Sequence, residues 1–176
     1  MGVDGLVVGQ ALKLDKRIGK QAYVIPGLGF AGGTLPRDLR IVQSLGRERK
    51  IATPLVDAIL EVNDSTAQAL VRVIRDKLGG LEKKRVLILG YTYKADTDTM
   101  RRSPSLELAQ FLAKEGAELH GYDPAMNSRD LSPIRGLIQH HIDLKDWGTE
   151  PDAIVLMTPR KEFANLDWTR LMPKRG

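Results

Sequence analysis

The sequence predicts an α/β protein in which a helical N-terminal region is joined by one long helix to a Rossmann-like domain with a parallel sheet. Two observations predict this class. After Thr53-Pro54, apolar residues recur at helical spacing for about 25 residues, up to Gly79-Gly80. From Lys84 onward the period changes, and a strand, a helix and a second strand follow one another. That βαβ order predicts a parallel sheet with right-handed crossovers. We therefore divide the chain into residues 1–80 and 81–176.

The N-terminal region is expected to hold two shorter helices before the long one. Val3 to Leu12 has the apolar spacing of a short amphipathic helix. A second helix is expected from Pro36 to Leu45, because proline is favoured at the first helical position and Gly46 can end the helix. Thr53 and Pro54 then suit the N-cap and the first position of the long helix. A helix of that length exceeds the globular average and is typical of one that joins two units.

The C-terminal region is expected to hold three main strands, at Arg85 to Leu89, Ala117 to Tyr122 and Asp152 to Met157. The last of these is almost continuously apolar, which is typical of parallel strands buried on both faces. Between the first two strands, Ser105 to Lys114 has an apolar helical face and follows a capping Ser103-Pro104. Between residues 130 and 148 the pattern is weaker. It indicates a short helix and an extra strand near Leu137 to Ile142.

Composition excludes several classes of function. The 176 residues include no cysteine, so the chain has no disulfide, thiol nucleophile or thiolate metal site. The net charge of +5 is dispersed, and the aromatic residues do not alternate with basic ones as a surface for stacking nucleic-acid bases requires. The apolar runs are too short to span a bilayer, and we expect no signal peptide. We therefore expect no nucleic-acid partner, no membrane partner and a cytoplasmic location.

The glycines at 27, 29 and 32 fit the G-x-G-x-x-G spacing of dinucleotide-binding loops. That fingerprint works between a strand and a helix, where the helix N-terminus meets the pyrophosphate. Here Pro26 directly precedes the first glycine, and the apolar run before it is short. The expected first strand is also followed by a single glycine, Gly90. We therefore do not interpret either segment as a Rossmann loop for NAD.

Three blocks of sequence carry the strongest functional signal: Asp15-Lys16-Arg17-Ile18-Gly19 with Tyr23 to Asp38, then Leu89 to Pro104, then Gly116 to Pro124. In the same order they resemble three motifs of the UDP-glucose/GDP-mannose dehydrogenase family. Those motifs are D-x-R-I-G with G-F-G-G-S-C-F-P-K-D, L-G-x-x-F-K-x-x-T-D-D-x-R-x-S-P, and G-A-x-V-x-x-Y-D-P. The resemblance covers most of the chain. It implies a central, dimerising region over 1–80 and a nucleotide-sugar-binding domain over 81–176.

The resemblance also implies roles for individual residues. The substrate-binding positions, with Arg17 reaching across a homodimer, are Arg17, Tyr23, Val24, Phe30, Ala31, Gly32, Tyr93 and Lys94. Arg37 and Arg101 match positions that contact NAD, for whose diphosphate a guanidinium fork is suited. Asp38 matches a carboxylate beside the active-site water. The implied ligands are NAD and a UDP- or GDP-linked sugar, with no metal. Without the resemblance, Arg17 and Lys94 would be interpreted as solvated charges and Asp38 as a first-turn acid.

The chain departs from the family at its central chemical group. Thr34 stands at the position of the nucleophilic cysteine, and a threonine hydroxyl is a far poorer nucleophile. The family's NAD domain and its catalytic lysine and asparagine precede the matched region. We therefore expect part of an NAD-dependent UDP-glucose 6-dehydrogenase-like enzyme that is inactive as this chain alone. One alternative is a non-catalytic module for nucleotide-sugar binding or dimerisation. Another, less favoured, is a different α/β enzyme with Asp38 or a histidine as base.

Overall fold

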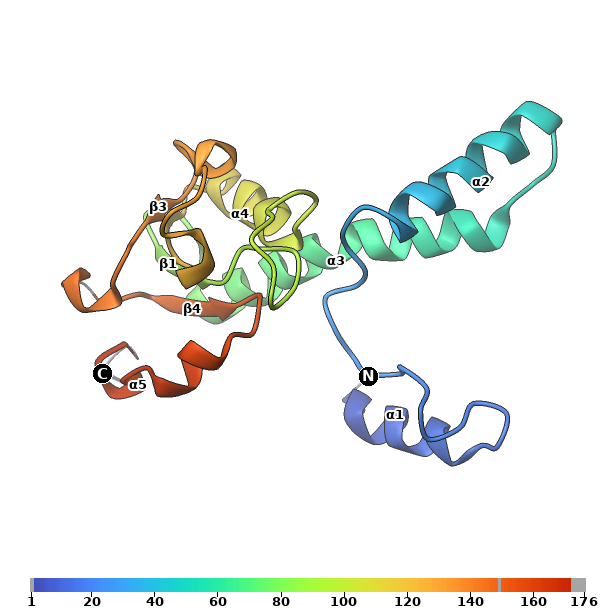
Figure 1. Cartoon of the computed structure of the whole chain (residues 1–176), viewed down its shortest axis with the longest axis horizontal. Coiled ribbons are helices and arrows are strands. Elements are labelled where there is room, and N and C mark those ends of the chain that lie inside the picture. The colour runs from blue at the N-terminus through green and yellow to red at the C-terminus, as the bar shows by residue number, and fades with distance from the viewer. Residues whose placement is uncertain (1, 149, 172–176) are drawn as a thin grey trace.

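The computed structural model describes residues 2–148 and 150–171 and has the expected α/β architecture (Figure 1). The N-terminal region consists of helices α1 (Gly5–Leu14), α2 (Leu35–Arg49) and α3 (Pro54–Leu78). The C-terminal region contains strands β1 (Arg85–Leu89), β2 (Glu118–Tyr122), β3 (Gln139–His140) and β4 (Ala153–Leu156), with helices α4 (Pro104–Lys114) and α5 (Trp168–Leu171). Short 3₁₀ turns link the later strands. Among the described residues, no helix is both long and apolar enough to cross a bilayer.

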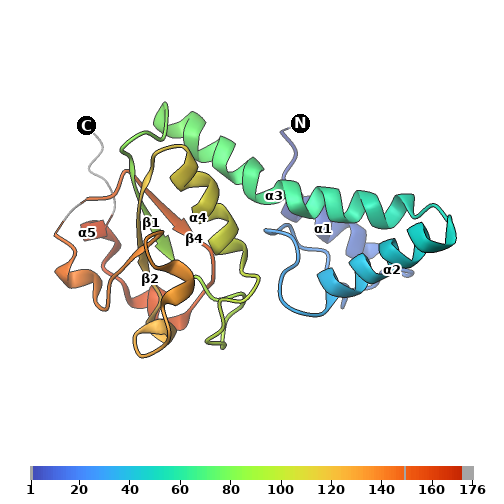
Figure 2. The same cartoon turned by 90° about the horizontal axis from the view of Figure 1, so that it is seen from above.

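The long helix is confirmed with the expected bounds, and it belongs to both regions. It has 25 residues and ends at Gly79, which adopts a left-handed conformation with φ of 69°. Its first half lies beside α2, where Arg40 and Asp64 form an ion pair at 3.2 Å. Its second half lies beside α4, where Arg75 pairs with Glu115 at 3.1 Å. Figure 2 shows the helix running from one region into the other, with α4 at one end and α2 at the other.

The prediction that the second helix ends near Gly46 is wrong, because α2 continues to Arg49. Gly46 is buried where α2 comes close to the turn into α3. A Cβ atom there would lie 2.8 Å from the carbonyl oxygen of Ile51 and 2.6 Å from a methyl carbon of Thr53. The glycine therefore permits a close approach, and the helix ends at Lys50 with φ of 55°. The first helix begins two residues later than expected, since the Asp4 side chain accepts from Leu6 N at 2.8 Å as its N-cap.

The sheet is parallel throughout, with strand order β3-β2-β1-β4. The central strand β1 is fully buried from Val86 to Leu89. Val86 and Ile88 pack on the face covered by α3 and α4, and Leu87 and Leu89 pack on the opposite face. The expected strand at Asp152 to Met157 is found as β4, but it is an edge strand with Leu156 50% exposed. Its interpretation as a strand buried on both faces is therefore wrong at that residue. The extra strand near residues 137–142 is confirmed as β3.

The strand order places a topological switch between β1 and β4, because β1 has β2 on one side and β4 on the other. Open α/β sheets commonly bind ligands at the carboxyl end of such a pair of strands. Here the chain itself fills that position. Gly90 follows β1 with φ of +77°, and a Cβ atom there would lie 2.4 Å from the carbonyl oxygen of Thr158, which follows β4. Thr158 Oγ1 also donates to the carbonyl oxygen of Thr92 at 2.5 Å.

Candidate functional site

The glycine-rich loop, residues 27–33, is fastened to the middle of α3. Asn63 Oδ1 accepts a hydrogen bond from Phe30 N at 2.7 Å. Gly29 has φ of +81°, and a Cβ atom there would lie 2.4 Å from the same Oδ1. Both the backbone conformation and the close approach therefore require glycine. No strand precedes the loop among the described residues, so it lacks the strand–loop–helix context of a dinucleotide fingerprint.

The same loop packs on the segment that follows β1. A Cβ atom on Gly32 would lie 3.0 and 3.1 Å from two ring carbons of Tyr93, so the bare glycine backbone lies against this ring. Arg102 Nη1 donates to the carbonyl oxygen of Gly33 at 3.2 Å. Lys94 Nζ lies 5.4 Å from the centre of the Tyr93 ring, within cation–π range. The structure thus brings together positions that we expected to bind substrate, from two blocks of sequence about 60 residues apart.

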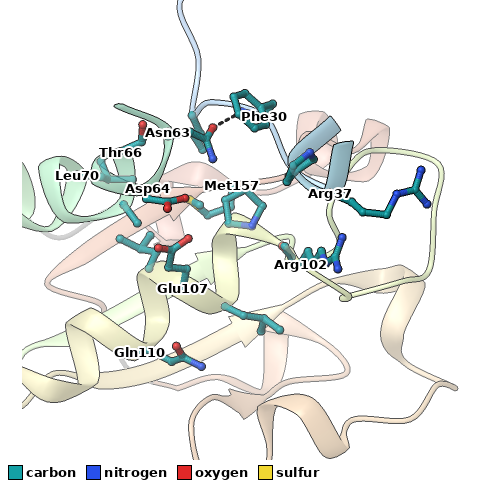
Figure 3. A pocket seen from close by; sticks show the side chains of 18 of the residues that line it. Phe30, Arg37, Asn63, Asp64, Thr66, Leu70, Arg102, Glu107, Gln110 and Met157 are labelled. Atoms are coloured by element: carbon teal, nitrogen blue, oxygen red, sulfur yellow. Dashed lines mark hydrogen bonds between the residues drawn. The ribbon is translucent and has the colours of Figure 1, made fainter. Parts of the chain in front are cut away.

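A pocket of about 390 Å³ opens beside this junction (Figure 3). The loop, the start of α2, the middle of α3 and the start of α4 surround it. Of the residues expected from the sequence, Phe30, Ala31 and Arg37 line it. Its charged lining was not expected: it also includes Arg40, Asp64, Arg102 and Glu107. Burial, and secondarily the charge of Asp64, raise the pKa of Glu107. Sequence patterns gave no signal for these four residues, because charged side chains on helix surfaces and in turns are usually solvated.

The residues expected at the reaction centre lie at the N-terminus of α2. Thr34 is its exposed N-cap residue, and its side chain makes no capping hydrogen bond. Among the described residues, none is hydrogen-bonded to the Thr34 hydroxyl, so no base is placed to activate it. Arg37 Nε donates to Asp38 Oδ1 at 2.9 Å, and both side chains are about half exposed. The two charged residues expected to serve the cofactor and the active-site water are therefore paired with each other.

Four further expected residues lie away from the pocket, from the Tyr93 contact and from the start of α2. Arg17 is exposed and pairs with Asp15 at 2.6 Å, while Tyr23 is 93% exposed. Val24 is partly buried, and its carbonyl oxygen lies against α1 at Gly9, where a Cβ atom would be 2.3 Å away. The Arg101 side chain is exposed, and its backbone N–H donates to Thr99 Oγ1 at 3.2 Å. In this single chain these residues do not converge with Tyr93 and Lys94.

The histidines form a separate cluster at the β2–β3 edge of the sheet. His120 Nδ1 and His141 Nε2 are 3.0 Å apart, and the His120 ring stacks on Trp147 with centroids 5.1 Å apart. His140 is hydrogen-bonded to the hydroxyl of Tyr91. Burial lowers the pKa of each histidine. None lines the pocket, and within the described residues no group of three or more metal-binding side chains could hold an ion.

A helical region and a parallel-sheet domain share one helix and meet where a glycine-rich loop lies on an aromatic ring, which defines a two-region α/β protein. Comparison with known families agrees with this class. Residues 87–175 match the UDP binding domain of the UDP-glucose/GDP-mannose dehydrogenase family, and residues 1–65 match its central domain. The chain belongs to this family. The boundary at residue 80 stays a prediction.

Individual relatives are similar over nearly the whole chain. UDP-glucose 6-dehydrogenase AglM of Haloferax volcanii is 33% identical over 168 residues, which cover 94% of this chain and 38% of the relative. GDP-mannose 6-dehydrogenase of Azotobacter vinelandii is 31% identical over 178 aligned positions, which cover 94% of this chain and 39% of the relative. The structure of a UDP-glucose dehydrogenase from Pyrobaculum islandicum matches with a TM-score of 0.82 at 30% identity, covering 95% of this chain and 38% of that one. The chain therefore spans less than two fifths of these relatives' length.

Proposed function

We propose that this chain forms the nucleotide-sugar-binding part of an NAD-dependent nucleotide-sugar dehydrogenase of the UDP-glucose 6-dehydrogenase type. One observation carries the proposal: the glycine-rich loop lies against Tyr93, so that two separate motifs expected to bind substrate meet. Family membership and the adjacent pocket support it. The ligand is a UDP- or GDP-linked sugar.

The chemistry of the junction suits a diphosphate ligand. Exposed loop glycines such as Gly33 let backbone N–H groups approach phosphate oxygens closely. Lys94 is exposed beside the Tyr93 ring and supplies a compact positive charge. Tyr93 offers the face on which the loop lies, so a ligand at this edge would meet the loop and the aromatic ring together.

Arg37 and Arg101 would supply the contacts of this chain to NAD. Both side chains are exposed, and the Arg101 guanidinium is not engaged by any other described side chain, so it fits a diphosphate. Bound NAD would supply the hydride acceptor for oxidation of the sugar C6 alcohol. The described residues contain no glycine-rich turn between a strand and a helix, so these contacts are peripheral to a dinucleotide site.

The chain alone is proposed to have no turnover. Thr34 is an exposed hydroxyl with no hydrogen-bonded base among the described residues, and such a hydroxyl is almost never ionised at neutral pH. Asp38 is the remaining candidate at the reaction centre, but it pairs with Arg37. The alternative function, a non-catalytic module that binds nucleotide sugars or dimerises, is favoured by the same observation at Thr34.

A homodimer is part of the proposal, and a cytoplasmic location stays a prediction. Large apolar side chains on α1 and on the solvent face of α3 are exposed: Leu6 at 57%, Leu14 at 81%, Leu55 at 73% and Val62 at 68%. An apolar surface of this kind is typical of protein–protein contacts. Figure 1 shows α1 lying apart from α2 and α3, so it leaves much of its surface uncovered by this chain. A partner would also be needed for Arg17 to reach a substrate.

Calorimetric titration with UDP, UDP-glucose, GDP, GDP-mannose and NAD tests the proposal. We expect one nucleotide series to bind and to raise the melting temperature by mass action. Lys94→Ala should weaken that binding about tenfold, the cost of one hydrogen bond to a charged group. Lys77→Ala, at an exposed position near the end of α3, serves as the matched control. Absence of binding by all nucleotides would refute the proposal, and NAD reduction by this chain alone would refute its inactivity.

A further inference from the structure

A buried ion pair lies beneath the loop that carries Tyr93 and Lys94. Arg160 Nε lies 2.6 Å from Asp123 Oδ1, and the two side chains are 8% and 0% exposed. Asp123 directly follows β2, and Arg160 follows β4. Burying two charges is costly unless their remaining hydrogen-bonding groups are also satisfied. The other partners of this pair therefore indicate what it holds in place.

Most of those partners belong to the segment after β1. Asp123 Oδ2 accepts from the backbone N–H groups of Tyr91 at 2.9 Å and Thr92 at 3.3 Å. Arg160 Nη2 donates to Thr92 Oγ1 at 2.7 Å and to the carbonyl oxygen of Thr97 at 3.0 Å. The guanidinium thus joins the beginning of this segment to a point five residues further along. We call residues 92–99 the Tyr93 loop.

The Tyr93 loop has few other internal restraints. Tyr93 N donates to the carbonyl oxygen of Thr99 at 3.1 Å, and the hydroxyls of Thr92 and Thr97 donate to the carbonyl oxygen of Lys94. The loop contains no helix or strand. A contact that spans from Thr92 to Thr97 therefore restrains its overall shape. The half-buried side chain of Tyr93 and the exposed side chain of Lys94 depend on that shape for their direction.

We propose that Arg160 is a positioning residue for the Tyr93 loop: through Asp123, Thr92 and Thr97 it fixes how Tyr93 and Lys94 are presented to a bound nucleotide. Arg160 is nearly buried and does not line the pocket, so it acts through the loop and not by touching the ligand. A lysine cannot replace it, because one ammonium cannot reach the carboxylate, a hydroxyl and a carbonyl oxygen in the fork geometry of a guanidinium. The ligand part of this inference rests on the proposed function.

Hydrogen–deuterium exchange on the ligand-free chain tests the restraint directly. Arg160→Lys keeps a cation near Asp123, and Thr92→Val removes the hydroxyl contact while leaving the ion pair intact. We expect both variants to exchange amides of the Tyr93 loop about tenfold faster, with β1 as protected as in the wild type. Arg170→Lys, exposed on α5, is the matched control and should change nothing. Unchanged exchange in the loop, or an equal rise throughout the sheet, would overturn the inference.

Nucleotide affinity then separates positioning from mere structural support. Titrated with UDP and with GDP at a temperature where it is fully folded, Arg160→Lys should bind about tenfold more weakly than the wild type. A purely structural role would lower the melting temperature without changing the affinity of the folded protein. Equal affinity in the wild type and Arg160→Lys would therefore overturn the inference. If the wild type binds neither nucleotide, the proposed function fails, and the exchange result still decides whether Arg160 restrains the loop.

Discussion

Replacing Gly90 with alanine probes the contact between the ends of β1 and β4. Gly90 N donates to the carbonyl oxygen of Tyr122 at 2.9 Å, and the carbonyl oxygen of Gly90 accepts from Ser105 Oγ at 3.2 Å. The residue is therefore held from both sides. A new Cβ atom would meet Thr158 O at 2.4 Å, Thr158 Cβ at 2.7 Å and Thr158 N at 3.0 Å. These atoms belong to or adjoin the backbone, so they cannot rotate away.

Two terms set the expected loss of stability. The φ of +77° costs an alanine about 1–2 kcal/mol, because Cβ is crowded in the left-handed region. Forcing an extra methyl group into a packed site costs about 1–3 kcal/mol through backbone shifts. Together they predict that Gly90→Ala lowers the free energy of unfolding by about 2–5 kcal/mol.

Two other glycines separate these terms. Gly79 has φ of +69° but nothing within 4 Å of its Cβ position, so Gly79→Ala should cost only the conformational term of about 1–2 kcal/mol. Gly27 has neither a positive φ nor a neighbour within 4 Å. Gly27→Ala should therefore be neutral, or stabilising by up to about 1 kcal/mol through the unfolded state.

Urea denaturation followed by circular dichroism measures all three variants, with the midpoint compared at a constant denaturant slope. The order of stability should be Gly27→Ala, then Gly79→Ala, then Gly90→Ala. If Gly90→Ala costs no more than Gly79→Ala, then the backbone of Thr158 does not lie where the structure places it. The hydrogen bond from Thr158 to Thr92 and the position of the Tyr93 loop would then also be in error.

Two further predictions concern the loop and the histidines. Asn63→Ala removes the acceptor for Phe30 N and should lower the free energy of unfolding by about 1–2 kcal/mol. It should also speed limited proteolysis within the glycine-rich loop. Cleavage at the wild-type rate would contradict this prediction. Burial lowers the pKa of His120 and His141 below the ordinary 6.5. As the pH falls, these histidines are therefore protonated in the unfolded chain at a higher pH than in the folded chain. The contribution of these histidines to stability should therefore be fully present above about pH 6.5 and should decline as the pH falls toward their lower native pKa values. In thermal melts at pH 5 to 8, His141→Gln should make the melting temperature depend less on pH.

The elements with long or repeated patterns were predictable from the sequence. The period of α3 continues over 25 residues and ends at a glycine, and the strand–helix–strand order of β1, α4 and β2 has the usual lengths. Gly46 was misinterpreted because glycine serves both for ending helices and for close approach, and the two uses look alike in sequence. The edge position of β4 could not be foreseen for a similar reason: an apolar run does not reveal whether a further strand lies beside it.

The site was predictable in its parts but not in its assembly. The motifs singled out Gly32 and Tyr93, yet only the fold shows that one lies against the other. Asn63 and Arg160 gave no signal as functional residues, because a lone polar residue on a helix or after a strand has no periodicity. The role of Arg160 depends on contacts with segments distant in the sequence.

The length of α3 has a mechanical consequence. A straight helix of 25 residues is about 37 Å long. Helix α2 is joined to the first half of α3 by an ion pair, and α4 is joined to the second half by another. The helix is continuous between these two contacts. A tilt of only about 5° at the α2 end would displace the far end by about 3 Å. A displacement of the helical region would thus be transmitted along α3 to the sheet domain. Relative motion of the two regions would be taken up at noncovalent contacts between them, such as that of Gly32 with Tyr93.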